Sequence, residues 1–93
     1  MSDEAKPIGV YDLLAVMLDQ CASVAWQKLG LQPDPITSKI EKNLPEAKIA
    51  IDVCAFLSGQ LEGTLDEDDR REVHNLVRNL RLNYVEKTKD GPS

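Results

Sequence analysis

The sequence predicts an all-α protein of three helices, on three observations. Apolar residues recur with helical spacing over about 10–29, 43–61 and 65–86. Helix-capping residues stand at the ends of these segments. A long, proline-containing loop separates the first two, whereas the second and third are joined near Gly63. With 93 residues in the chain, we expect one domain over 10–86, between a mobile N-terminal tail at 1–9 and a flexible C-terminal tail at 87–93.

The first helix, about 10–29, is predicted from an apolar arc and a clear stop. Gly30 directly follows the segment and is a good C-terminal cap residue. At about 100° per residue, the apolar side chains cover roughly half of the helix circumference. They are Val10, Leu13, Leu14, Met17, Leu18, Cys21, Val24, Ala25 and Leu29.

The second helix, about 43–61, has Asn43 as its predicted N-cap, Pro45 in the first turn and Glu46 three residues after the cap. Its clear polar stripe is narrow and centres on Lys48, Asp52 and Gly59. A helix that is apolar nearly all round must be covered nearly all round. We therefore expect a homodimer, formed by the surplus apolar surface of helices one and two.

The third helix, about 65–86, is predicted to begin with a capping box. In that motif the Thr64 hydroxyl accepts from the Glu67 amide while the Glu67 side chain reaches back. The apolar stripe is narrower here and fits packing along one seam. It consists of Val73, Leu76, Val77, Leu80 and Tyr84. We expect helix two to be central, with helix three antiparallel to it.

The loop from Gly30 to Lys42 contains Pro33-Asp34-Pro35, which cannot be helical through its centre. We interpret this stretch as a stiff connector, with a rigid recognition loop as the alternative. Ile36 and Ile40 are predicted to anchor the loop to the core.

Several blocks of this sequence resemble a family of small bacterial proteins called domain of unknown function 1844. The blocks are Tyr11-x-Leu13-Leu14, Ala25-Trp26-x-Lys28-Leu29-Gly30-Leu31-x-Pro33-Asp34-Pro35, Leu44-x-x-Ala47-Lys48-x-Ala50-Ile51-Asp52 and Leu80-Arg81-x-x-Tyr84-Val85. The resemblance spans about residues 10–86. It implies a short, all-helical, stand-alone bacterial protein, and it carries no activity or catalytic residue to this chain.

Composition favours a soluble protein of the cytoplasm. No apolar run reaches the roughly 18 residues that a bilayer span requires, and the N-terminus is polar and acidic rather than signal-like. The formal net charge of −5 argues against a general affinity for nucleic acid.

Residues that could perform chemistry are few, so we expect neither enzymatic activity nor a cofactor. Cys21 and Cys54 lie in apolar runs and are expected to be buried core residues, with a single bridge between them left open. His74 is the only histidine, and no metal-ligand spacing is present. The acids available for a catalytic carboxylate pair are Asp12, Asp19 and Asp52, which we interpret as solvated helix-face residues.

All four arginines lie between positions 70 and 81, which makes this segment the main candidate for an interaction surface. Together with the histidine, they fall within an arc of about 100° on the third helix. The arc consists of Arg70, Arg71, His74, Arg78 and Arg81.

Three interpretations of this arc stay open. It is a solvated face with intrahelical pairs, for example between Glu67 and Arg70 or Arg71. Alternatively, it meets acids of another helix or another copy of the chain. The third interpretation is a surface that binds RNA or another phosphate-rich partner.

Trp26 and Tyr84 complete the set of candidate interaction residues. Trp26, at the edge of the first apolar face, is either an interface anchor or packed under its own loop. The function expected from these observations is a non-enzymatic, self-assembling protein–protein interaction module. The alternative is an RNA- or ribosome-associated factor that binds phosphate through Arg70, Arg71, Arg78 and Arg81.

Overall fold

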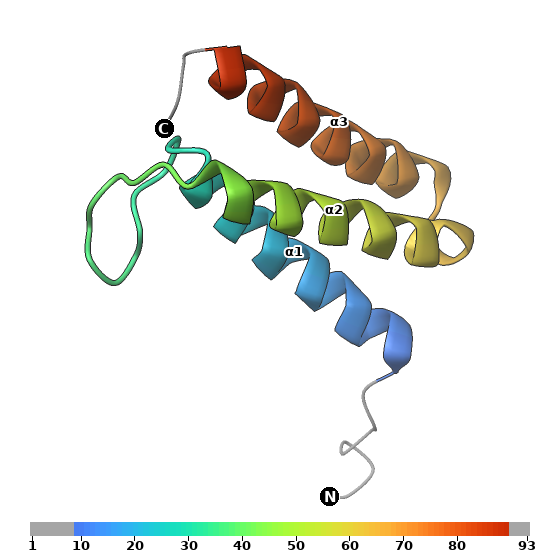
Figure 1. Ribbon diagram of the computed structural model, residues 1–93. Helices are drawn as coiled ribbons and strands as arrows, with labels where there is room; N and C mark the ends of the chain where they lie inside the picture. Colours follow the sequence, from blue (N-terminus) through green and yellow to red (C-terminus); the bar gives the residue numbers. More distant parts are fainter. Residues whose placement is uncertain (1–8, 90–93) are drawn as a thin grey trace, which may run out of the picture.

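A computed structural model of the chain describes residues 9–89, and within that range it contains helices and no strand (Figure 1). The helices are α1 (Val10–Lys28), α2 (Leu44–Leu61) and α3 (Glu67–Lys89), with a short 3₁₀ helix, η2 (Glu62–Thr64), between α2 and α3. The prediction of an all-α, three-helix fold is confirmed.

The structure describes only part of the two predicted tails, 1–9 and 87–93. Residues 1–8 and 90–93 lie outside the described residues, and Gly9 is the N-cap of α1. At the other end α3 continues through Lys89, three residues beyond the helix end predicted at 86. Lys87 and Lys89 stand in the last turn, where positive charge complements the negative end of the helix dipole.

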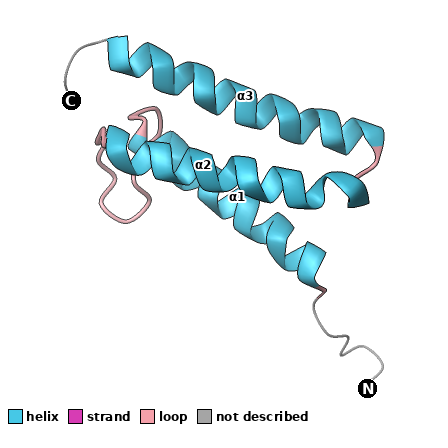
Figure 2. Ribbon diagram, turned by 45° about the vertical axis from the view of Figure 1, so that its right-hand side comes forward, coloured by secondary structure: helices cyan, strands magenta, loops and turns pink. Residues whose placement is uncertain are grey.

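The α2 helix lies between α1 and α3, as predicted, and the chain reverses direction at each connection (Figures 1 and 2). The Asn43 amide donates to the Lys28 carbonyl at 2.7 Å, which joins the end of α1 to the start of α2. The η2 turn brings α3 back along α2. Because α2 is flanked on both sides, it contributes more buried residues than either neighbour.

The core is apolar and centred on α2. The large side chains Leu29 and Leu80 are fully buried, and so are the small side chains of Ala25 and Ala47. Small residues at a helix–helix contact let the two backbones approach closely, because no bulky side chain separates them. The buried hydrophobic residues are Leu18, Ala22, Ala25, Leu29, Leu44, Ala47, Ile51, Cys54, Leu57, Leu61, Val77 and Leu80.

The N-terminal half of α1 diverges from α2 (Figures 1 and 2). Buried residues of α1 begin only at Leu18, whereas Val10, Leu13 and Met17 are exposed. The apolar arc predicted for this helix therefore serves the core only in its C-terminal half. In the remaining half only Leu14 packs against the core cluster, and the apolar side chains of Val10, Leu13 and Met17 stay exposed.

The loop between α1 and α2 is organised by its own hydrogen bonds. Gly30 has φ +81°, which favours glycine at this helix C-terminus. The Asp34 carboxylate accepts from the amides of Ile36 at 2.7 Å and Thr37 at 3.1 Å, and these two bonds lower the pKa of Asp34. The predicted anchoring role of Ile36 and Ile40 is wrong, because Ile36 is 90% exposed and Ile40 is 63% exposed.

The start of α3 differs from the predicted capping box. The Asp66 carboxylate accepts from the Asp69 amide at 2.8 Å, so Asp66 caps the helix. Thr64 is part of η2, and its hydroxyl donates to the Leu61 carbonyl at 2.9 Å. Because this 3₁₀ turn follows α2, α3 begins at Glu67, two residues later than predicted, and Thr64 bonds back to the last residue of α2. By contrast, the predicted Asn43 cap is confirmed, since its side chain accepts from the Glu46 amide at 3.2 Å.

Candidate interaction surfaces

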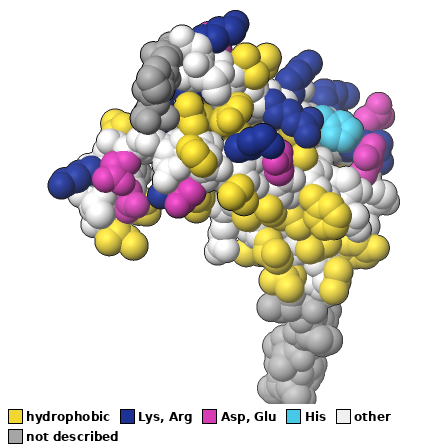
Figure 3. Space-filling view, viewed as in Figure 1, with side chains coloured by type: hydrophobic (Ala, Val, Ile, Leu, Met, Phe, Trp, Pro, Cys, Tyr) yellow, Lys and Arg dark blue, Asp and Glu magenta, His cyan; other side chains and the backbone are white. Residues whose placement is uncertain are grey.

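The basic arc on α3 is divided by the fold into three parts with different surroundings. Arg70 lies over the α2–α3 connection, Arg71 lies at the outer edge of the arc, and His74, Arg78 and Arg81 line a groove between α2 and α3. Lys and Arg side chains gather over α3 in the space-filling view (Figure 3).

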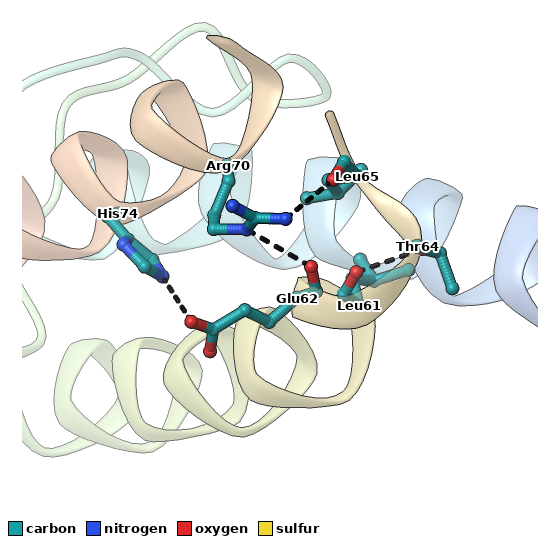
Figure 4. A network of polar contacts seen from close by, with 6 residues as sticks. All are labelled: Leu61, Glu62, Thr64, Leu65, Arg70 and His74. Carbon is teal, nitrogen blue, oxygen red and sulfur yellow. Dashed lines mark hydrogen bonds and ion pairs between the residues drawn. The ribbon is translucent and has the colours of Figure 1, made fainter. Parts of the chain in front are cut away.

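The Arg70 side chain binds the backbone of the α2–α3 connection (Figure 4). Its Nε donates to the Glu62 carbonyl at 3.2 Å, and its Nη2 donates to the Leu65 carbonyl at 2.9 Å. Carbonyls at a helix C-terminus lack intrahelical partners, and this guanidinium supplies donors for that region. Within the predicted arc, the guanidinium of Arg70 is thus engaged by backbone carbonyls, whereas Arg78 and Arg81 line the groove.

Arg71 makes an intrahelical contact, although not with the predicted acid. Its Nη1 lies 3.6 Å from an Asp68 carboxylate oxygen, at a spacing of three residues. The predicted pairs of Glu67 with Arg70 or Arg71 are wrong, because Arg70 turns to the backbone carbonyls and Arg71 to Asp68. Both partners of the Arg71 pair are largely exposed, so its contribution to stability is small.

The α2–α3 groove has a volume of about 570 Å³. Small residues of α2 form one side, with Ala55, Ser58 and Gly59 following one another along the helix. The α3 side carries the cationic residues Arg78 and Arg81.

At one end of this groove, Glu62 faces His74, with 3.8 Å between the Oε2 and Nε2 atoms (Figure 4). The other apolar residues that line the groove come from α3. They are Val77, Leu82 and Val85. The groove therefore combines an apolar lining with arginines on one side and a carboxylate at one end.

Tyr84 and Trp26 are both half-buried against the core. Tyr84 and Arg81 line a smaller hollow of about 270 Å³ beside Lys48 and Asp52, which form an ion pair at 2.9 Å. The backbone carbonyl of Trp26 accepts from the Leu31 amide at 3.1 Å, at the beginning of the loop. The structure thus places Tyr84 next to the basic arc and Trp26 at the opposite edge of the fold from the α2–α3 turn.

A second surface, the apolar face, runs along α1 and α2. It consists of Val10, Leu13, Met17, Val24, Ile49 and Phe56, all of them exposed. Figure 3 shows hydrophobic side chains gathered over these two helices. The largest apolar patch of a typical monomer measures about 300–600 Å² and is often functional.

The Lys28–Glu46 ion pair shows that the two halves of the apolar face adjoin. Lys28 Nζ lies 3.3 Å from a Glu46 carboxylate oxygen and so connects α1 to α2. Val24 precedes Lys28 by one helical turn, and Ile49 follows Glu46 by one turn. The apolar face is therefore continuous between the two helices near this pair, whereas Val10, Leu13 and Met17 lie on the half of α1 that diverges from α2.

Cys54 is fully buried and Cys21 is half-buried, and both are free thiols. Burial raises the pKa of the Cys54 thiol from 9.0 to about 11, with a smaller contribution from Cys21. A thiol of this kind stays protonated and unreactive at neutral pH. The prediction that Cys54 is a core residue is confirmed.

The raised pKa of Cys54 has a measurable consequence for stability. The unfolded thiol loses its proton near pH 9.0, whereas the folded thiol holds it to about pH 11. The native state therefore binds more protons in this range, and the free energy of unfolding should fall as the pH rises, by at most about 1.4 kcal/mol per pH unit. The free energy of unfolding, measured by urea denaturation at a series of pH values, should fall less steeply with pH in Cys54→Ala than in Cys21→Ala. An equal pH dependence in the two variants would contradict the assignment.

The residues considered for catalysis are not brought together. Asp52 pairs with Lys48 on α2, while Asp12 and Asp19 lie on α1. Among residues 9–89, no three His, Cys, Asp or Glu side chains are placed to hold a metal ion. Over the same range, no helix combines the length and apolar character that a membrane crossing requires.

The fold and its surfaces define a small all-α protein with an apolar helical face and a cationic groove. The model of the family described as Domain of unknown function (DUF1844) matches residues 12–86, and the chain belongs to this family. Searches of the curated proteins and of the solved structures each found no match to the chain.

Proposed function

We propose that this protein is a non-enzymatic, self-assembling interaction module of the cytoplasm that forms a homodimer through the apolar face of α1 and α2. The observation that carries the proposal is the exposure of large apolar side chains on two adjoining helices. Ile49 and Phe56 are each 65% exposed on α2, the helix that contributes most to the core. Such surface is stabilised when it is buried against a partner.

A second copy is the favoured occupant, because the face is formed by adjoining antiparallel helices. A two-fold axis through such a face pairs each helix with its counterpart, which is the symmetry of most homodimers. The exposed apolar side chains in the N-terminal half of α1 would be covered in the same step. A chain of this size also hides a limited share of its surface alone, so added burial stabilises it strongly.

The test is the mass of the protein in solution. Sedimentation velocity at micromolar concentration should give twice the 10.3 kDa mass of the chain. Ile49→Glu or Phe56→Glu should give the mass of a single chain, because a buried, unpaired carboxylate is costly at an apolar contact. Circular dichroism should show that helix content is retained, since glutamate is a good helix former.

Ile36→Glu is the matched control. It introduces the same charge in place of the same exposed side chain, but in the loop and away from the apolar face. This variant should sediment as the wild type does. A single-chain mass for the wild type, or for Ile36→Glu as well as Ile49→Glu, would overturn the proposed dimer face.

The RNA- or ribosome-associated alternative has less support. It relies on four arginines, of which Arg70 is engaged with backbone carbonyls and Arg71 with Asp68. The remaining pair lies in a groove that also contains the Glu62 carboxylate. That carboxylate, at one end of the groove, would repel a phosphate backbone.

A further inference from the structure

The α2–α3 groove is open to a close approach by another backbone. A Cβ atom added at Gly59 would meet nothing within 4 Å, so this part of α2 presents open space. Ser58 and Ala55 continue the small surface along the same helix. From His74 to Val85 the α3 side of the groove is about 17 Å long, at 1.5 Å per residue, which is the length of about three helical turns.

The apolar lining of the groove includes side chains that are about half exposed to solvent. Leu82 is 56% exposed and Val85 is 47% exposed, and they stand three residues apart on α3. Residues at this spacing lie on one face of a helix and contact a partner together. The apolar side of an amphipathic helix therefore fits this groove.

The charged residues of the groove determine which polar side chains such a helix should carry. Lys28, Lys48, Arg71 and Lys89 each form an ion pair with a carboxylate. Arg78 instead donates to the Asn75 amide oxygen at 2.7 Å, and among residues 9–89 neither Arg78 nor Arg81 forms an ion pair. Guanidinium groups bind carboxylates with two parallel hydrogen bonds, so these residues match acidic side chains.

A protein fits this combination better than a nucleic acid. Among the described residues that line the groove there is no Phe, Tyr or Trp, so unpaired bases lack the large aromatic platforms that single-strand binding uses. The Glu62 carboxylate at the far end repels phosphate but accepts a basic residue or a helix N-terminus. We propose that the α2–α3 groove binds an acidic amphipathic helix of a partner protein, with its carboxylates on Arg78 and Arg81 and its apolar side on the groove lining.

The proposal goes beyond the dimer, because the groove and the apolar face are different surfaces. Its test selects 16-residue helical peptides from a displayed library on the full-length protein and measures their affinities by fluorescence anisotropy. Selected peptides should carry Asp or Glu beside apolar residues spaced three and four apart. Arg81→Glu should weaken them about ten- to a hundredfold, the loss expected for a charge-assisted contact.

Two variants distinguish the groove from general charge and from loss of folding. Arg71→Glu makes the same charge change on the same helix outside the groove, and it should leave affinity within about threefold. Gly59→Leu fills the groove and should abolish binding, while helix content and thermal stability are kept or raised, because leucine favours a helix more than glycine does.

Several results would overturn the groove proposal. They are selected peptides without acidic residues, equal losses in Arg71→Glu and Arg81→Glu, or unchanged binding in Gly59→Leu. Tighter binding of a 12-nucleotide single-stranded RNA, lost in Arg81→Glu, would replace the peptide with RNA as the ligand.

Peptide binding that is retained by Ile49→Glu would show that the groove acts independently of the dimer face, whatever the mass of that variant.

Discussion

Replacing Leu80 with alanine should lower the free energy of unfolding by about 2–5 kcal/mol, a large share of the stability of a small domain. Leu80 lies on α3 and is fully buried in the core cluster with residues of α1 and α2. The truncation removes apolar contacts and leaves a cavity that its neighbours fill only in part.

Leu82→Ala is the matched control for this experiment. Leu82 is on the same helix but 56% exposed, so its truncation should change the free energy of unfolding by less than about 0.5 kcal/mol. Urea denaturation at one fixed protein concentration measures both, because dimer formation would make stability depend on concentration. Similar losses at the two positions would contradict the packing of α3 against α2.

Enlarging Ala25 to leucine should destabilise the fold by about 1–3 kcal/mol, although the change adds apolar surface. Ala25 and Ala47 are fully buried in the same core cluster, on the two helices that pack against each other. A larger side chain there forces the helices apart or into strained rotamers, since a close-packed interior has no space for it.

Ala15→Leu tests the same change at an exposed position of α1. It should leave stability unchanged or raise it slightly, because no neighbour has to move. Thermal denaturation followed by circular dichroism compares the two variants directly. A melting temperature for Ala25→Leu at or above that of the wild type would show that α1 and α2 are not in close contact at this position.

Local features of the fold could be predicted because local chemistry controls them. Asn43 caps α2 through its own side chain, and Gly30 ends α1 because glycine adopts a positive φ without strain. The three helical segments follow from apolar periodicity in the same way. The start of α3 was predicted wrongly because Thr64 and Asp66 both suit a cap, and the 3₁₀ turn after α2 decides between them.

The candidate surfaces could be predicted only in outline. Helical spacing placed the four arginines on one arc. The position of the α2 C-terminus, however, decides that Arg70 donates to the carbonyls of Glu62 and Leu65. The groove itself depends on Gly59 and Ser58, which carry no functional signal in the sequence. Only the packing of α3 against α2 brings Gly59 and Arg81 into the lining of the same groove.

The sequence by itself determined the three helices, the central place of α2 and the surplus of apolar surface on α1 and α2. Capping, periodicity and composition act over a few residues, so they can be read directly along the chain. The tertiary structure alone decided which part of that surface stays exposed and which arginines form no ion pair within residues 9–89. Both depend on the divergence of α1 and the position of α3, which are set by contacts between residues far apart in the chain.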